Sequence, residues 1–220
     1  MSVTPESVRQ MLSSQDLGDR LRAVNLIRQL EPSAGYELIQ TAVKDSSARV
    51  RYSAVSQLDT LGNQNRDLTL NLLRDCLLND PEADVQAAAA DCLGALKLQD
   101  AFEDLQQIYQ TTKEWIVQLS IVAALGELGD PRGFELLRDA IASDNDLVIT
   151  AAIGSLGELG DQKAVPLLAP YVKNPDWQLR YRLVQALNHL GGTDAKSLLE
   201  TLAKDEVEAV ATEAKKSLNH

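Results

Sequence analysis

The sequence is poor in aromatic residues and in the residues that carry redox, metal or proton-transfer chemistry. Aromatic side chains make up 4% of its 220 residues, and it has two cysteines and two histidines. Cys76 and Cys92 lie in apolar stretches without the spacing of a disulfide framework or a metal site, so we expect buried thiols in a reducing compartment. Phosphate-binding glycine loops, G-x-S-x-G, H-E-x-x-H and paired C-x-x-C motifs are absent. We therefore expect no metal site.

Basic residues are fewer than acidic ones. The chain has 21 Lys and Arg against 32 Asp and Glu, a net charge of −11, which argues against broad binding to nucleic acids or anionic membranes. No uncharged stretch is long enough to span a bilayer. The N-terminal segment MSVTPESVRQML carries an acidic and a basic residue where a signal peptide needs an apolar run. We expect a cytoplasmic protein without membrane insertion.

The chain contains an internal repeat. Val117–Asp130, VQLSIVAALGELGD, recurs as Val148–Asp161, VITAAIGSLGELGD. In the first copy the apolar residues recur every three or four positions and form one helical stripe, and each copy ends in Leu-Gly-Asp, which favours a helix stop followed by a cap. Counting from Val117 and Val148 gives equivalent positions elsewhere at Asp19, Val50, Val85, Leu179 and Val210. Periods in this range are typical of solenoids, in which stacking of units makes the core.

The repeat predicts an all-α fold, an α-solenoid of about six to seven helical hairpins of about 31 residues each. We expect a single domain over residues 1–220, with a degenerate N-terminal cap (1–31), regular repeats (32–204) and a C-terminal capping helix (205–220). In that last helix Glu208, Glu213, Lys215 and Lys216 are expected on an exposed outer side. The predicted helices are Pro5–Leu12, Leu17–Leu30, Ala34–Lys44, Ser47–Leu61, Leu68–Leu78, Glu82–Leu98, Phe102–Gln110, Lys113–Leu128, Arg132–Ala142, Asp146–Leu159, Lys163–Val172, Asp176–Leu190, Asp194–Ala203 and Glu206–Leu218, with residues 62–67 as a lengthened loop.

The scarce aromatic residues indicate a candidate binding surface. Trp115 and Trp177 both precede their reference position by two residues, which predicts that they share one edge of the stack. Arg180 and Tyr181 follow Trp177 within about one turn, and the pair Arg51-Tyr52 occupies the same place in an earlier repeat. Such side chains can hold a flat, carboxylate-bearing ligand by stacking and bidentate hydrogen bonding.

A structural role is the alternative for these residues. Arginine at this position, with Asp45 before Arg51 and Asn174 before Arg180, is also typical of a hydrogen-bond ladder between repeats. Trp177 and Tyr181 are equally compatible with core packing. The repeat-equivalent pair Glu127 and Glu158 favours a solvated stripe.

The motifs D-x-x-V-R-x-x-A and A-L-G-x-L-G-D resemble the HEAT-like repeats of the phycobilin lyase family, over nearly the whole chain. The run DWQLRYRLVQAL is similar to that family's W-x-V-R-Y-A-A-V helix. The resemblance is closest to the members linked to phycobilisome degradation in cyanobacteria. The Y-Y-A-A-W-W stretch of the chromophore-attaching subunits and the cysteine-containing run of the isomerising subunits are absent. The resemblance therefore implies degradation-linked detachment of bilins, or plain binding, rather than attachment or isomerisation.

The resemblance implies that phycobiliprotein subunits are the partners and that an open-chain tetrapyrrole such as phycocyanobilin is the bound chromophore or product. Tyr181 and His189 are then the candidates for proton transfer, and Arg51, Tyr52, Trp115, Trp177 and Arg180 for binding. The alternative is a non-enzymatic scaffold that docks a phycobiliprotein or another protein, with the aromatic residues as anchors. The sequence leaves the oligomeric state open.

Overall fold

The computed structural model describes residues 3–219, and every regular element in that range is a helix. These residues group into two compact units, Met1–Ile121 and Val122–His220, and each unit is described by itself. The predicted all-α solenoid of helical hairpins is confirmed. Its organisation as a single domain stays a prediction.

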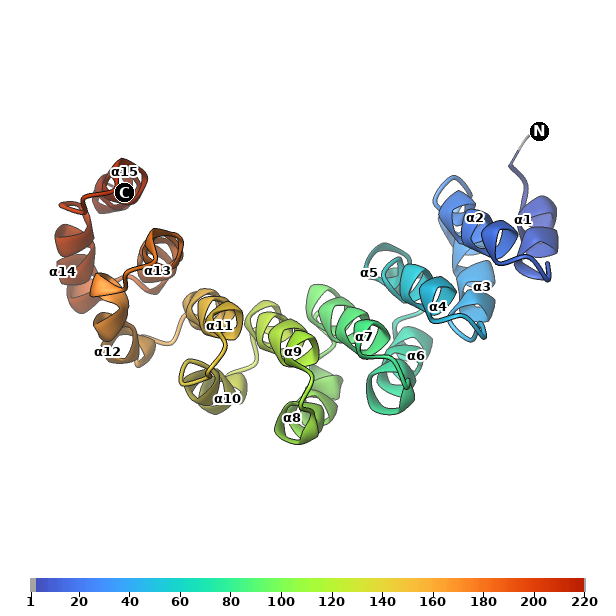
Figure 1. Cartoon of the computed structure of the whole chain (residues 1–220), viewed down its shortest axis with the longest axis horizontal. Coiled ribbons are helices and arrows are strands. Elements are labelled where there is room, and N and C mark those ends of the chain that lie inside the picture. The colour runs from blue at the N-terminus through green and yellow to red at the C-terminus, as the bar shows by residue number, and fades with distance from the viewer. Residues whose placement is uncertain (1–2, 220) are drawn as a thin grey trace. The chain divides into compact units, whose positions relative to one another are not determined.

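Unit 1 is built from successive helix pairs (Figure 1). The N-terminal helix begins at Pro5 under a capping box, in which the Ser7 amide donates to Thr4 Oγ1 (3.2 Å) and the Thr4 amide donates to Ser7 Oγ (3.1 Å). Helices α2, α4 and α7 pack side by side in one layer, which buries Val50 and Val85 completely. The α-helices of this unit are α1 (Pro5–Leu12), α2 (Leu17–Ile27), α3 (Pro32–Ala42), α4 (Ala48–Val55), α5 (Leu58–Leu61), α6 (Arg66–Asn79), α7 (Ala83–Ala95), α8 (Phe102–Thr111) and the start of α9 (Trp115–Leu128).

Unit 2 repeats the same arrangement with three helix pairs after the end of α9. The second helix of each pair, α11, α13 and α15, packs against its neighbour in one layer. The reference residues Val148, Leu179 and Val210 lie in the core, each 3% exposed or less. The helices are α10 (Gly133–Ala140), α11 (Asp146–Leu159), α12 (Ala164–Leu168), α13 (Trp177–Leu190), α14 (Gly192–Leu202) and α15 (Glu208–Leu218).

Two glycines, one in the last turn of α11 and one directly after it, explain the recurring L-G-x-L-G-D motif. A Cβ on Gly157 would lie 2.6 Å from the Ala186 Cα, so glycine is needed for α11 and α13 to pack this closely. Gly160 ends the helix in the left-handed conformation, with φ +75°. Asp161 then accepts a hydrogen bond from the Lys163 amide (2.9 Å) and turns the chain into the next pair. The predicted helix stop is confirmed, whereas the predicted cap by the aspartate is wrong, because the N-cap of α12 is Lys163, which makes no side-chain cap hydrogen bond.

Two predicted helices and one predicted loop were wrong in detail. The span Ser47–Leu61 is interrupted at Ser56 and Gln57, where the buried Gln57 amide donates to the Val24 carbonyl of a neighbouring helix (3.0 Å). The span Lys163–Val172 ends as a 3₁₀ helix over Ala169–Lys173, because Pro170 has no N–H to continue the α-helical pattern. Residues 62–67 hold a short 3₁₀ helix, Gly62–Gln64, before α6 begins at Arg66. The remaining predicted boundaries differ by three residues or fewer.

Candidate functional site

Arg51 and Arg180 are held inside the fold. Arg180 donates from Nε and Nη2 to the two carboxylate oxygens of Asp205 (2.6 and 2.8 Å) and from Nη1 to the Asn174 carbonyl (2.6 Å). Arg51 bonds Asp80 in the same bidentate way (2.7 and 2.9 Å) and also reaches a carbonyl six residues before it (3.0 Å). The side chain of Arg180 is only 7% exposed. These guanidinium groups therefore join successive repeats.

The same hydrogen bond recurs at the equivalent place in other repeats. Arg20 donates to the Ser14 carbonyl (3.0 Å) and pairs with Asp45 (2.8 Å). Gln86 and Gln118 each donate from Nε2 to the carbonyl six residues earlier (3.0 and 3.3 Å). We call this set the ladder: Arg20, Arg51, Gln86, Gln118 and Arg180 with their acceptors. It is the structural alternative that the sequence left open for the arginines.

The ladder shifts the proton affinity of its carboxylates. The Arg180 hydrogen bonds are the main cause that holds the pKa of Asp205 below its ordinary value, against the opposing effect of burial. At Asp80 burial works to raise the pKa, but the hydrogen bonds from Arg51 and from the Glu82 amide outweigh it and lower the pKa. Both carboxylates are thus held in the charged form that the ladder requires.

The predicted aromatic residues are exposed to different degrees. Tyr52, Trp115 and Trp177 are 49%, 46% and 44% exposed, high values for such large side chains. Tyr181 is half-buried. Because Trp115 belongs to unit 1 and Trp177 to unit 2, their predicted common edge stays a prediction.

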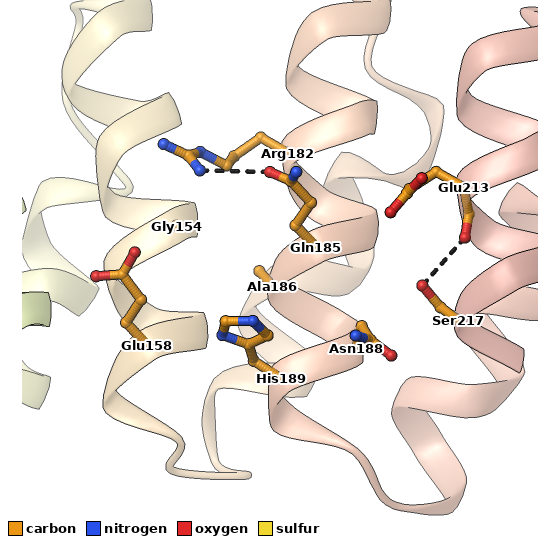
Figure 2. A pocket seen from close by; sticks show the side chains of 9 residues that line it. All are labelled: Gly154, Glu158, Arg182, Gln185, Ala186, Asn188, His189, Glu213 and Ser217. Carbon is orange, nitrogen blue, oxygen red and sulfur yellow. Dashed lines mark hydrogen bonds between the residues drawn. The ribbon is translucent and has the colours of Figure 1, made fainter. Parts of the chain in front are cut away.

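A polar hollow of about 280 Å³ lies over α13, between α11 and α15 (Figure 2). We call it the α13 hollow. It is lined by Gly154 and Glu158 from α11, by Arg182, Gln185 and His189 from α13, and by Glu213 from α15, among others. The three helices form one packed layer, so the hollow is a depression in a continuous helical surface.

Arg182 supplies a cation to this hollow, and most of its hydrogen-bond donors are free for a ligand. Its side chain reaches from α13 toward α11 (Figure 2), and a Cβ on Gly154 would come within 3.1 Å of its Nε. The guanidinium makes one hydrogen bond, a long one of 3.3 Å from Nη1 to the Gln185 Oε1. Four of its five N–H donors are left to solvent or to a ligand, in contrast to Arg180.

His189 is exposed in the same hollow and lies on the side of α13 that faces Glu158 (Figure 2). An imidazole is able to give or take a proton near neutral pH. At about 100° per residue, His189 and Arg182 fall within about 20° of each other around α13, whereas Trp177 and Tyr181 lie about 80–140° away on the same exposed half. One helix therefore presents two aromatic rings along one edge, and a cation and an imidazole along the other.

The structure separates five of the seven predicted site residues into two groups. Trp177, Tyr181 and His189 share the exposed side of α13, while Arg51 and Arg180 lie in the ladder. The sequence reasoning missed Arg182, although it stands two residues after Arg180 in the same run. It also placed Glu213 on an exposed outer side, whereas Glu213 is half-buried, 28% exposed, pairs with Lys216 (3.4 Å) and lines the α13 hollow.

Two further observations concern metal binding and membrane spanning by the described residues. Within residues 3–219, no three His, Cys, Asp or Glu side chains are grouped so that they could hold a metal ion. In the same range no helix combines the length and apolarity needed to cross a bilayer.

The profile of the family described as HEAT repeats matches residues 70–157 and 144–219, which together cover more than half of the chain. The chain belongs to the HEAT-repeat family. These two matches include all of the α13 hollow and most of the helix pairs described above. Among curated protein sequences, no match was found.

Several solved structures share the fold. A chain of the complex of CpcE and CpcF of phycocyanin lyase from Nostoc sp. PCC7120 superposes with a TM-score of 0.65 at 21% identity, over 100% of this chain and 95% of that one. The Escherichia coli protein YibA gives a TM-score of 0.70 at 16% identity, over 98% and 81%. An archaeal HEAT-like repeats protein from Thermococcus onnurineus NA1 gives 0.59 at 13% identity, over 100% and 97%. At these identities the similarity establishes the fold.

Proposed function

We propose that this protein binds phycobiliprotein subunits and promotes phycobilisome disassembly by detaching bilin chromophores from phycobiliprotein cysteines. The exposed side of α13 is the observation that carries the proposal, because it brings aromatic rings, a cation with free donors and an imidazole onto one helix. The fold similarity to a chain of the phycocyanin lyase complex supports the substrate class. The resemblance of the sequence to the degradation protein NblB supports detachment as the direction.

The structure changes the residues to which we assign the ligand. Bilins carry two propionates, and the sequence assigned them to Arg51 and Arg180. Since those groups are already bonded to carboxylates in the ladder, we assign a propionate to Arg182 instead. A hollow of about 280 Å³ lies at the lower end of the usual size of small-molecule sites. It has room for one propionate-bearing end of a tetrapyrrole, and Trp177 and Tyr181 offer stacking surfaces for the rest.

Detachment is an elimination. A base removes a proton from the carbon next to the one that bears sulfur, the C–S bond breaks with its electron pair going to sulfur, and the thiolate takes up a proton. The products are a free cysteine thiol and a bilin with one additional C=C bond, so no oxidant or reductant is consumed. His189 is positioned in the hollow to accept the first proton, and Tyr181 is the second candidate for proton transfer.

A scaffold without chemistry is the second candidate. The ladder favours it, because two of the seven predicted site residues serve the fold. In this alternative Trp177 and Tyr52 are anchors of a protein interface, and the α13 hollow receives a side chain of the partner.

The test mixes the purified protein with phycocyanin that carries phycocyanobilin. Visible absorption is followed, and the products are separated by size to find the pigment. Pigment that leaves the phycocyanin supports detachment, whereas co-migration of both proteins with unchanged absorption supports the scaffold. If no pigment is released and the two proteins do not co-migrate, detachment and the scaffold role are both refuted.

Substitutions test whether residues of the α13 hollow are needed for pigment release. Arg182→Ala and His189→Gln should lower the rate of pigment release by about tenfold or more, the effect expected when a charge contact or a proton-transfer group is lost. Lys163→Ala is the matched control, because it removes an exposed cation of the same unit that lies outside the hollow. If Lys163→Ala lowers release as much as Arg182→Ala, general charge rather than the hollow drives binding.

A further inference from the structure

A second hollow, of about 260 Å³, lies over α7 in unit 1 between α4 and α9. We call it the α7 hollow. Its floor is formed by Ala87 and Ala88, which are 4% and 5% exposed, and Tyr52 from α4 and Ile116 from α9 form its walls. Helices α4 and α7 are packed neighbours (Figure 1). The depression exists because the small Ala87 stands where Tyr52 stands in the preceding repeat.

Two carboxylates lie along this floor. Asp84 and Asp91 are seven residues apart on α7, so they fall on the same side of the helix, about 10 Å apart along its axis at 1.5 Å per residue. Among residues 3–219, neither has an ion-pair partner, whereas the ladder carboxylates Asp80 and Asp205 are both paired with arginine. The hollow thus combines unpaired negative charge with an exposed aromatic ring.

The surroundings of Asp91 are not those of an ordinary surface carboxylate. Although Asp91 meets solvent, the walls of the hollow remove part of its hydration, and this desolvation raises its pKa despite a side-chain hydrogen bond from Ser120. A cation placed here would stabilise the carboxylate with little further desolvation cost. Within residues 3–121, no lysine or arginine forms an ion pair with it.

We propose that the α7 hollow binds a basic peptide segment of a partner protein, with one arginine between Tyr52 and Asp91 and a second arginine at Asp84. The planar guanidinium suits both contacts, since it stacks on an aromatic ring and bonds a carboxylate with two N–H groups. The net charge of −11 favours a basic partner. In a polyproline II segment, residues i and i+3 lie on the same side about 9 Å apart, which matches the spacing of the two carboxylates.

This proposal does not depend on bilin chemistry, because it concerns another unit, and Tyr52, the residue it shares with the candidates above, lies outside the α13 hollow. The probe is the peptide acetyl-Gly-Arg-Pro-Pro-Arg-Gly-amide, added to the full-length ¹⁵N-labelled protein at 100 mM salt. Amide shift changes are expected at Tyr52, Ala87, Asp91 and Ser120. The same peptide with citrulline in place of arginine has the same shape without charge, and it should cause no shift at these positions.

Variants separate the hollow from general attraction to an acidic protein. Asp84→Asn with Asp91→Asn should weaken binding by about tenfold. Tyr52→Ala should weaken it by about threefold and Tyr52→Phe should not, because cation–π attraction requires only the ring. Asp144→Asn with Glu200→Gln is the matched control, because it removes two exposed charges from unit 2, and it should change affinity by less than about twofold.

Three results would overturn the proposal. Equal losses in the two charge-removal variants would mean diffuse attraction, and equal binding of the citrulline peptide would mean an apolar or hydrogen-bonding occupant. Shift changes confined to other surfaces, or none with the arginine peptide at millimolar concentration, would mean that the α7 hollow is not a basic-peptide site. Circular dichroism of each variant checks that the helices remain folded.

Discussion

Replacing Arg180 with alanine should destabilise unit 2 strongly. The substitution leaves the Asp205 carboxylate, whose side chain is 6% exposed, without its counter-charge, and it leaves the Asn174 and Pro175 carbonyls without their donor. Removing one partner of a buried ion pair costs about 3–5 kcal/mol. Asp205 keeps its hydrogen bond from the Val207 amide (2.9 Å), so we expect about 3 kcal/mol.

Arg182→Ala provides the contrast on the same helix. Arg182 is exposed, and its single long hydrogen bond joins it to another side chain of α13. Surface substitutions of this kind change the free energy of unfolding by about 0.5 kcal/mol or less. The two variants thus remove the same chemical group two residues apart and should differ about sixfold or more in their cost.

Urea unfolding measures this difference. The chain has two tryptophans, one in each unit, so Trp115→Phe leaves Trp177 at the start of α13 as the fluorescent reporter of unit 2. With a slope of about 2 kcal/mol per molar urea, Arg180→Ala should lower the midpoint by about 1.5 M. A loss below about 1 kcal/mol, or an equal loss for Arg182→Ala, would refute the assignment of Arg180 to the ladder.

Three further predictions test the fold and its titrating groups. Because the pKa of Asp205 is lowered in the folded state, the stability it contributes is present above its unfolded value of about 3.9 and is lost as pH falls through the folded value. As the pH is lowered from 5 to 2, the melting temperature should therefore fall less steeply for Asp205→Asn than for the parent protein. Burial raises the pKa of Cys76 to about 11 and that of Cys92 to about 12, so neither thiol should react with Ellman's reagent at pH 8 until the protein is unfolded. Gly157→Ala places a Cβ 2.6 Å from the Ala186 Cα and should cost about 1–3 kcal/mol in urea unfolding, whereas Gly133→Ala, with 3.6 Å to its nearest neighbour, should cost little.

The sequence was sufficient where local chemistry decides the structure. The helix stop at Gly160 and the turn at Asp161 follow from the glycine and aspartate themselves, and the period of about 31 residues gave the buried reference positions. The interruption at Pro170 could also be predicted from the sequence, since proline removes a helical N–H, although we expected one helix to continue through it.

The sequence was insufficient where a contact depends on a distant residue. The break at Gln57 coincides with a hydrogen bond to Val24, 33 residues away. The bidentate partner of Arg180 is Asp205, 25 residues further on, and a helical arginine next to a half-buried tyrosine gives no local sign of it. Likewise the α7 hollow arises from the difference in size between Ala87 and the residues facing it, which only packing reveals.

These contacts suggest how structure and function divide within a repeat. Residues that recur at one place of the unit, such as Arg20, Arg51 and Arg180, make the same hydrogen bonds in each repeat and therefore maintain the stack. A ligand distinguishes one repeat from another only through residues that differ between repeats. Arg182 corresponds to Ala88 three repeats earlier and to Ser120 two repeats earlier, and this single position supplies the cation of one hollow and part of the floor of the other. Substitutions at recurring positions should therefore lower stability first, whereas substitutions at variable exposed positions should alter binding without unfolding the protein.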